Sequence, residues 1–353
     1  MRRFRLALFA LGLTLAVVGL GATVLTREHV DERHRSLELA GTAGVKRLEN
    51  VTEQAAAAAL LTARNTAFAD FYAAPGGREE KIRQGGPLMD RVNAGLRYLA
   101  ELYPDWISEA CFIDRSGAEN AQVTDGRVTD WSDLDTGEQD EPFFAPGFRQ
   151  QYGHVYQSPP HVSDYTGDWV VTSVAKVDAG PGVAPAIIHF EVRIEGFRQA
   201  LIPDSLWVVQ VVDRRTGRIV LDSRMPQDTG APLGPGGRLP VAALRNDGLV
   251  SHVHGRDTYV GIPEFAPGNA NDWALVVSTS GRDGLLIADP PLLAYGLLLA
   301  GLVLLILAAI GQRAHWRGVR RAAREDPLTG LANRAEARRL AERMLSRGTL
   351  GAV

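Results

Sequence analysis

The two stretches that decide the fold of this 353-residue chain are Phe112-Ile-Asp-Arg-Ser-Gly-Ala118 and Val211-Val-Asp-Arg-Arg-Thr-Gly-Arg218. Each begins as an apolar β-type run, ends that run in an aspartate, and continues into a basic turn that contains glycine. A strand, a polar turn with glycine and a returning strand form the sequence pattern of a β-hairpin. Because the pattern occurs twice, the sequence predicts two small α/β sheet domains in tandem.

Further strands are predicted on either side of these hairpins. A distal sheet is expected over about 105–196 and a proximal sheet over about 205–280. The expected distal strands are 106–114, 118–123, 170–177 and 186–194, and the proximal ones are 206–213, 218–222, 248–254, 258–262 and 272–278.

Two helices are expected before the first sheet. Residues 27–72 predict one long helix, because small and apolar residues recur at intervals of three and four positions. A break at 73–77 precedes a second helix over about 79–102. The long helix is either a mechanical link to a membrane or a support for the sheets. Its expected stripe consists of Leu37, Gly44, Leu48, Val51, Ala55, Ala58, Asn65 and Phe68.

Two uncharged apolar runs flank the predicted sheets. Leu6 to Leu25 and Pro290 to Gln312 are each long enough for a helix to cross the hydrocarbon core of a membrane. The first run is longer than a usual signal-peptide core and lacks a clean A-x-A cleavage site, so an uncleaved anchor is favoured over a signal peptide. Arginines flank both runs on the sides that the positive-inside rule assigns to the cytoplasm.

The sequence therefore predicts a multi-pass protein of the bacterial inner membrane, with both termini cytoplasmic, a periplasmic sensor region and membrane lipid as one partner. The expected segments are a cytoplasmic N-terminus (1–5), a first transmembrane helix (6–26), the periplasmic region (27–289), a second transmembrane helix (290–312), a cytoplasmic signalling helix (313–325) and the beginning of a further domain (326–353).

Composition excludes several classes of function. The 45% hydrophobic content is typical of a globular rather than a disordered chain. A single cysteine, Cys111, excludes an intramolecular disulfide, and in its apolar strand we expect a small buried hydrophobe. The sequence contains no Walker loop, no zinc-type spacing and no Ser/His/Asp set. It also has no patch of interleaved basic and aromatic residues, so no nucleic-acid partner is expected.

Near the end of the chain stands Asp326-Pro-Leu-Thr-Gly-Leu-Ala-Asn-Arg334. It resembles the opening motif of the GGDEF family, the bacterial diguanylate cyclase domain, which reads D-x-L-T-G-L-x-N-R. The resemblance covers about residues 320–353 and implies an α/β domain that begins here. Asp326 is expected to cap the following helix, and Gly330 to supply a tight turn. The resemblance implies structural and coupling roles, not catalytic ones, for Asp326, Leu328, Thr329, Gly330, Leu331, Asn333 and Arg334.

The GGDEF resemblance implies an output for the whole protein. Such an enzyme joins two GTP molecules into cyclic-di-GMP with Mg²⁺ and releases two pyrophosphates, and two output domains must meet. A homodimer through the membrane and signalling helices is therefore expected. The family's metal-binding aspartate, guanine contacts and G-G-D-E-F loop have no counterpart among these residues. We accordingly expect the chain as given to lack cyclase activity, and assign GTP and Mg²⁺ only to a full-length parent. The alternative is a non-catalytic receptor with a degenerate domain, feeding an EAL phosphodiesterase.

Residues 27–285 resemble the double Cache sensor, which combines a long helix with two tandem PAS-like sheets. Tyr103-Pro-Asp-Trp106 and Tyr165-Thr-Gly167 carry this resemblance. It implies a periplasmic small molecule bound to the distal sheet under the loops between its second and third strands, here about 125–169. The candidate ligand-binding residues in and beside that segment are Trp131, Arg149, Tyr156, Asp164 and Trp169.

The chemistry of these candidates leaves the ligand open. An arginine can clamp a carboxylate, and an aspartate opposed by aromatic rings can hold an ammonium group, which together suit a zwitterion. However, the R-x-W-Y and D-x-x-T-G runs of amino-acid-binding relatives are not reproduced at Arg149 and Asp164. The alternative is that the aromatic residues belong to the core and the charges to a solvated loop.

No metal site is predicted. His252 and His254 alternate along an expected strand, but only Asp257 lies near as a third ligand, so surface strand residues are the favoured interpretation. The acidic residues Asp133, Asp135, Glu138, Asp140 and Glu141 are expected to form a solvated loop.

Overall fold

The computed structural model of the chain describes residues 2–180, 182–201, 207–233, 244–245, 247–251, 257–279, 290–326 and 329–348. The chain divides into two units, one formed by Arg33–Gly284 and the other by Met1–Glu32 together with Leu285–Val353. Three residues that carry expectations above, His252, His254 and Leu328, lie outside the described residues.

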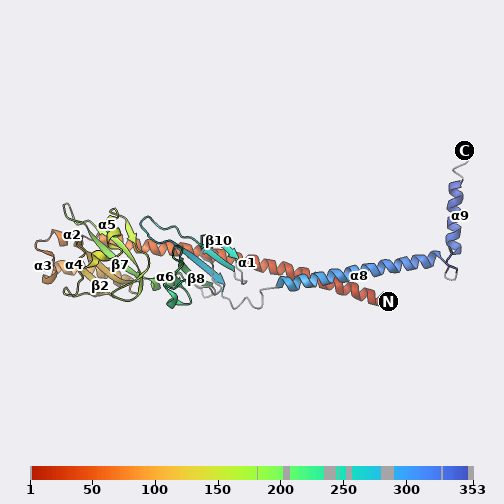
Figure 1. Ribbon diagram of the computed structural model, residues 1–353, viewed down its shortest axis with the longest axis horizontal. Helices are drawn as coiled ribbons and strands as arrows, with labels where there is room; N and C mark the ends of the chain where they lie inside the picture. The colour runs from red at the N-terminus through yellow and green to blue at the C-terminus, as the bar shows by residue number, and fades with distance from the viewer. Residues whose placement is uncertain are drawn as a thin grey trace. The chain divides into compact units, whose positions relative to one another are not determined.

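A seven-stranded antiparallel sheet forms the first half of the Arg33–Gly284 unit. Its strands lie in the order β3-β2-β1-β7-β6-β4, and β5 pairs with another part of β6. Strands β1 and β7 lie side by side at its centre (Figure 1). The strands are β1 (Ile107–Ile113), β2 (Glu119–Thr124), β3 (Arg127–Val128), β4 (Val155–Gln157), β5 (His161–Val162), β6 (Trp169–Val177) and β7 (Ala186–Arg193). This is the distal sheet that the first hairpin pattern predicts.

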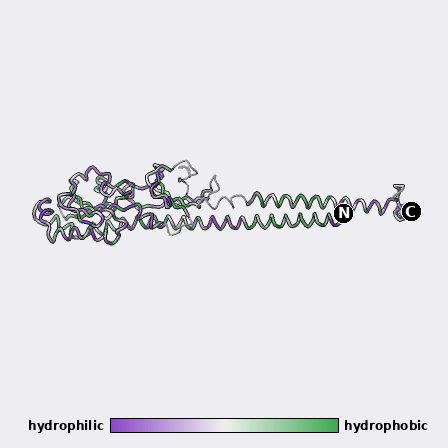
Figure 2. The backbone as a smooth tube through the Cα atoms, turned by 90° about the horizontal axis from the view of Figure 1, so that it is seen from below, coloured by the Kyte–Doolittle hydropathy of each residue, from purple (hydrophilic) through white to green (hydrophobic). Residues whose placement is uncertain are grey.

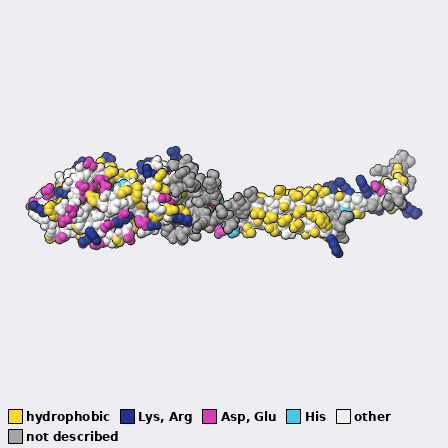
Figure 3. Space-filling model, turned by 60° about the horizontal axis from the view of Figure 1, so that its bottom comes forward, with side chains coloured by type: hydrophobic (Ala, Val, Ile, Leu, Met, Phe, Trp, Pro, Cys, Tyr) yellow, Lys and Arg dark blue, Asp and Glu magenta, His cyan; other side chains and the backbone are white. Residues whose placement is uncertain are grey.

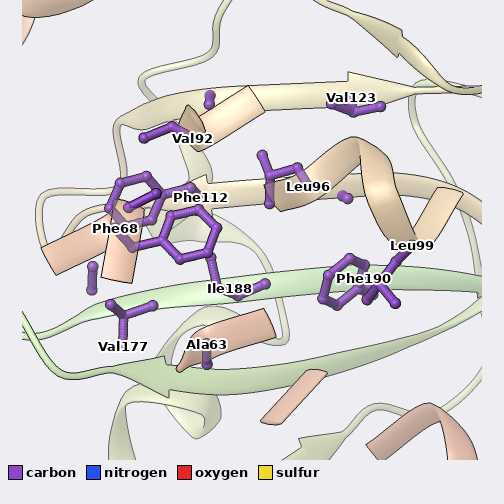
Figure 4. Packing of buried hydrophobic residues seen from close by; sticks show 14 of the residues in the cluster. Ala63, Phe68, Val92, Leu96, Leu99, Phe112, Val123, Val177, Ile188 and Phe190 are labelled. Atoms are coloured by element: carbon purple, nitrogen blue, oxygen red, sulfur yellow. The ribbon is translucent and has the colours of Figure 1, made fainter. Parts of the chain in front are cut away.

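Helices cover one face of the distal sheet. They are the end of α1 (Arg2–Ala63), α2 (Thr66–Ala73), α3 (Arg78–Gln84) and α4 (Pro87–Leu102). Their apolar side chains pack against alternate residues of β1 and β7, with Phe68 and Phe112 in contact at 4.8 Å between ring centroids. Figure 4 shows Leu96 and Leu99 of α4 beside Ile188 and Phe190 of β7 in this core.

Two predicted helices are interrupted within their expected bounds. The long helix does not reach residue 72, because Asn65 adopts an extended backbone (φ −65°, ψ 124°). Its side chain instead caps α2 by accepting a hydrogen bond from the Ala67 amide at 3.0 Å. The second helix is divided in two by Gly85 and Gly86, whose φ angles of 61° and 78° suit glycine and end α3.

A second antiparallel sheet, of five strands in the order β10-β11-β12-β8-β9, forms the other half of the unit. Helix α6 (Ile194–Leu201) follows β7 directly and contributes Phe197 to the core around Trp273, at 6.1 Å between ring centroids. The strands are β8 (Trp207–Asp213), β9 (Ile219–Asp222), β10 (Gly248–Ser251), β11 (Asp257–Gly261) and β12 (Trp273–Thr279). The second predicted sheet is thus present, and the short 3-10 turn η2 (Pro226–Asp228) follows β9.

Two helices of the structure are long and apolar enough to cross a membrane, namely α1 from Leu6 onward and α8 over Leu293–Arg321. The first part of α1 and α8 (Pro290–Arg324) run side by side within their unit, and both are apolar along the shared length (Figure 2). Hydrophobic side chains cover most of the visible surface of this pair (Figure 3). Helix α8 continues without interruption past Gln312 to Arg324.

Small residues allow these two helices to approach closely. A Cβ atom on Gly301 of α8 would lie 2.5 Å from the Ala16 amide nitrogen and 2.7 Å from the Gly12 carbonyl oxygen of α1. A Cβ atom on Gly19 would lie 2.7 Å from the Leu298 amide nitrogen. The pairing is antiparallel, because later residues of α1 meet earlier residues of α8. Close contact at small residues is typical of packed membrane helices.

The motif at 326–334 forms a turn between α8 and α9 (Arg334–Gly348). Asp326 does not cap α9 as expected; its carboxylate accepts hydrogen bonds from the amide and hydroxyl of Thr329, both at 3.1 Å. The cap is Asn333, whose side-chain oxygen accepts from the Glu336 amide at 3.0 Å. Gly330 has φ 71° and supplies the expected tight turn. Asn333, and not Asp326, is the N-cap residue because it immediately precedes the first helical residue.

Candidate functional site

The distal sheet has a second face, which carries polar side chains at its centre. Along β1, Ala110 and Phe112 belong to the helical core, so Glu109 and Cys111 point to the opposite side. In the register of β1 with β7, Glu109 lies opposite Glu191 and Cys111 opposite His189. Directly opposite residues of an antiparallel pair share one face. These four polar side chains are therefore neighbours at the centre of the sheet.

A cover of loop and short helix closes this face. It contains the 3-10 turn η1 (Glu138–Asp140) and α5 (Phe144–Arg149), which belong to the predicted segment 125–169. Phe143 and Phe144 pack on Cys111, Ile113, Val174 and Ile187. The Phe143 ring lies 4.4 Å from the His189 ring between centroids. Because of this cover, every residue of β1 is buried on both sides of the sheet.

Glu109 is fully buried, and only one of its two carboxyl oxygens has hydrogen-bond partners among the described residues. Its Oε1 accepts hydrogen bonds from the Cys111 thiol and from the Gln122 amide, both at 2.9 Å. Its Oε2 has no hydrogen-bond partner among the described residues. Burial, together with the charge of Glu191, raises the pKa of Glu109 to about 9. A carboxyl group in such surroundings holds its proton until a positive charge arrives.

Two more buried carboxyl groups lie beside it under the cover. Glu119 accepts a hydrogen bond from the Asp135 amide at 2.9 Å, and Glu138 accepts one from the Tyr165 hydroxyl at 3.3 Å. Burial raises the pKa of Glu138 to about 8, and the charges of Glu119, Glu141 and Asp135 add to the effect. The expectation of a solvated acidic loop is therefore wrong for Glu138, which is 3% exposed.

Glu191 differs from the other three carboxyl groups because it has a histidine partner. Its Oε1 lies 3.7 Å from His161 Nε2. Burial favours the neutral form of Glu191, but the interactions with His161, His189 and Ser163 together outweigh it and lower the pKa of the carboxyl group. Burial likewise lowers the pKa of His161, and the contact with Glu191 more than restores it, so the net shift is upward. The contact therefore favours the charged form of each group.

His189 is a neutral, buried imidazole without a polar partner. Burial lowers its pKa to about 4. Neither ring nitrogen has a hydrogen-bond partner among the described residues, although the residue is only 2% exposed. One donor atom each of Glu109, Cys111 and His189 lie within 4.8 Å of one another. These three residues form a group that can hold a metal ion.

The five ligand-binding residues predicted from the sequence are dispersed. Trp131 is 54% exposed, and Arg149 and Asp164 are also exposed. Tyr156 is half-buried against the Phe143 cluster, whereas Trp169 packs on the proximal core. No hydrogen bond or ion pair joins any two of these five residues, all of which the structure describes. Their role in ligand binding stays a prediction.

The residues of the buried face were missed because each strand was read for its apolar content. A signal was present: Glu109 and Cys111 alternate in β1, and His189 and Glu191 alternate in β7. Such alternation places both members of a pair on one side of a strand. In two strands otherwise apolar on both sides, it marks a polar face under a cover.

Comparison with known proteins defines the fold. The sequence matches no protein-family model and no curated protein. Among solved structures, the sensory domain of the Campylobacter jejuni chemoreceptor Tlp3, with isoleucine bound, has a TM-score of 0.54 at 8% identity, covering 75% of this chain and 97% of that chain. A domain of a sensory box/GGDEF family protein from Vibrio parahaemolyticus has a TM-score of 0.55 at 10% identity, covering 72% and 98%.

The ligand-binding domain of the Pseudomonas fluorescens chemoreceptor CtaA, in complex with L-isoleucine, has a TM-score of 0.50 at 12% identity and covers 73% of this chain and 96% of that chain. At these identities the likeness concerns the fold. The chain has the α+β fold of Cache and PAS-like sensor domains, a long N-terminal helix with tandem antiparallel sheets, and the predicted fold class is confirmed.

Proposed function

We propose that this chain is the receptor part of a transmembrane signalling protein, and that a small molecule or ion binds on the buried polar face of the distal sheet. The observation that carries the proposal is the set of buried carboxyl groups Glu109, Glu119, Glu138 and Glu191 beneath one cover. Burying a charged or unpaired polar group destabilises a protein unless a partner compensates it. Such a cluster is therefore kept for binding.

The charge of the face indicates the charge of the ligand. Glu109 and Glu138 hold their protons at neutral pH, because burial raises the pKa of each carboxyl group and few positively charged groups lie nearby. A ligand with a positive charge lets these groups ionise and binds through them. The isoleucine in the structures of Tlp3 and CtaA belongs to those proteins. It supports a small-molecule ligand for a domain of this fold, and not an amino acid in particular.

The proposed topology follows from the two apolar helices. The Arg33–Gly284 unit stands outside the inner membrane, α1 and α8 cross it, and both termini lie in the cytoplasm. The charge distribution around the apolar runs supports this orientation. A ligand shifts the receptor only by its differential affinity for two arrangements of the sensor. Helices α1 and α8 carry the change to the cytoplasm.

The proposed output of the whole protein is the synthesis of cyclic-di-GMP by paired GGDEF domains that hold GTP and Mg²⁺. Its support is the motif at 326–334 and the turn that it forms between α8 and α9. The alternative output is a degenerate domain that acts through an EAL phosphodiesterase.

The experiment is a cell assay with the chain fused at its C-terminal end to a complete diguanylate cyclase domain. Cyclic-di-GMP is measured after adding amines, amino acids or divalent metal salts singly. We expect one class of cation to change the level severalfold, and Glu191→Gln to abolish the response. Tyr98→Ala, an exposed residue of α4, is the control. A response lost in Arg149→Ala but kept in Glu191→Gln places the ligand in the exposed loops instead.

A further inference from the structure

We propose that Glu109, Cys111 and His189 bind a divalent transition-metal ion of the zinc class on the buried face of the distal sheet. The proposal rests on the proposed function, because it names the ligand class of the same site. It uses three residues from two adjacent central strands, so the ligand positions are fixed by the sheet itself.

The geometry brings three donor atoms together. Cys111 and His189 face each other across β1 and β7, and Glu109 precedes Cys111 by two positions on the same face. Their donor atoms lie within 4.8 Å of one another. Metal bonds of about 2.0–2.3 Å place tetrahedral ligands roughly 3.3–3.7 Å apart. Small side-chain rotations are enough to close this difference.

Buried polar atoms without hydrogen-bond partners among the described residues indicate that this group of side chains binds a ligand. His189 is 2% exposed and offers two ring nitrogens without hydrogen-bond partners among the described residues. Glu109 is 0% exposed, and its Oε2 is also without such a partner. Buried polar atoms in folded proteins nearly always have a partner, so each exception requires an explanation. A metal ion satisfies the imidazole and the carboxylate together.

The donor types select the kind of ion. A thiolate and an imidazole favour zinc, nickel and copper, whereas magnesium and calcium prefer oxygen ligands. Three protein ligands leave a fourth position open for water or an exchangeable ligand, the arrangement of accessible zinc sites. An organic ammonium ion explains the carboxyl groups but gives no role to Cys111 or to the neutral His189 ring. The three donors therefore favour a metal over an amine.

The surroundings support the same ligand set. Gln122 donates its amide to Glu109 Oε1 at 2.9 Å, which orients the carboxylate from the neighbouring strand. The Phe143 ring packs at a tilt against the His189 ring and shields it from water. The carboxyl groups of Glu119 and Glu191 are buried on the same face, so a dication bound there has further acidic groups beside it. On binding, the Cys111 thiol and the Glu109 carboxyl group each release a proton to solvent, and the metal takes the place of both protons.

The test uses the full chain in lipid nanodiscs, stripped of metal with a chelator and titrated with Co²⁺ and then Zn²⁺. We expect one Co²⁺ per chain, an absorption band from thiolate-to-cobalt charge transfer, and displacement by Zn²⁺. Cys111→Ser, which keeps the side-chain shape, should abolish the band, and His189→Gln should weaken binding at least tenfold. His154→Gln, an exposed histidine, is the matched control and should bind like the wild type.

Two outcomes overturn the metal site. The first outcome is that the wild-type chain shows no charge-transfer band and retains no metal. This outcome needs no variant, so misfolding of a variant cannot obscure it. A band that survives Cys111→Ser is the other. Circular dichroism of each metal-free variant separates loss of binding from loss of fold. If the metal site fails while an amine changes cyclic-di-GMP in the fusion assay, the receptor function stands without the metal.

Discussion

The side-chain amide of Gln157 donates a hydrogen bond to the main-chain carbonyl oxygen of Thr52 across 3.0 Å, which ties the end of β4 to α1. The same side chain accepts a hydrogen bond from Asn269 at 2.8 Å, and the main chains of Gln157 and Asn269 form a parallel bridge. Gln157 is 4% exposed. One buried residue therefore connects the distal sheet, the proximal half and the long helix.

Gln157→Leu should weaken this junction. The Thr52 carbonyl and Asn269 amide would lose a buried partner, and each such loss destabilises a protein by about 1–3 kcal/mol. We expect a lower thermal unfolding midpoint for the full chain, and a weaker response of the cyclase fusion. Gln151→Leu, at an exposed position nearby, is the matched control. Unchanged stability and response in Gln157→Leu contradict a coupling role.

Stability should fall as the pH rises toward 8 because of Glu138. Its folded pKa of about 8 lies above the ordinary carboxyl value, so the folded chain holds a proton that the unfolded chain has already lost. The stabilisation is complete below the ordinary pKa of about 4.3 and disappears as the pH passes through the folded pKa. The charges facing Glu138 are those of Glu119, Glu141 and Asp135.

Glu138→Gln cannot ionise and should flatten this dependence. The measurement is the thermal unfolding midpoint of the full chain at pH 5 and pH 8. Glu109, whose pKa is also raised, contributes in the same direction, so the slope should decrease without vanishing. An equal slope in wild type and variant shows that Glu138 ionises freely. Glu195→Gln, on the part-exposed surface of α6, should leave the slope unchanged.

The strands were predictable because their information is local. Each predicted strand has a counterpart that begins and ends within a few residues of the prediction, since apolar runs and glycine turns mark both ends, whereas the short strands β3, β4 and β5 were not predicted. The helix break at Asn65 was not predictable, because an asparagine at this position also fits the periodic pattern of one long helix. Its side chain caps α2 only when that helix turns onto the sheet. The buried face was predictable only in part, because the alternation of polar residues marks one side of β1 and of β7 but not the cover above it. Its carboxyl groups meet through the register of β1 with β7 and the closure of the cover over Glu138, and both are long-range events.

The orientation in the membrane can be tested with single cysteines in a Cys111→Ser background. Ser132→Cys lies at an exposed position of the sensor unit, and Arg338→Cys lies on the exposed surface of α9. A membrane-impermeant maleimide should label the first in intact cells and the second only after lysis. Labelling of Arg338→Cys in intact cells would falsify the proposed topology. The Cys111→Ser parent measures background.

The contact between α1 and α8 should depend on Gly301. A larger residue there meets main-chain atoms of Gly12 and Ala16, which cannot turn aside as a side chain can. We expect Gly301→Leu to separate the two helices and to lower the temperature at which the detergent-solubilised chain aggregates. Gly296→Leu lies on the same helix with nothing within 4 Å and is the control. Equal aggregation temperatures for the two variants count against close packing.

The last junction lies between α8 and α9, where one asparagine serves both helices. The Asn333 side-chain amide donates to the Ala323 carbonyl oxygen at 2.6 Å, and its side-chain oxygen caps α9 through the Glu336 amide. Loss of an N-cap costs about 0.5–2 kcal/mol of helix stability. Asn333→Ala should therefore speed hydrogen–deuterium exchange over 334–340, while Asn333→Asp keeps the cap and loses only the donor to Ala323. If the cap alone matters, Asn333→Asp exchanges like the wild type. The hydrogen bond from Asn333 to Ala323 also joins α9 to α8. If signalling requires this bond, both variants lose the response of the cyclase fusion, because α8 no longer positions the first helix of the output domain. Unchanged exchange in Asn333→Ala contradicts the cap itself.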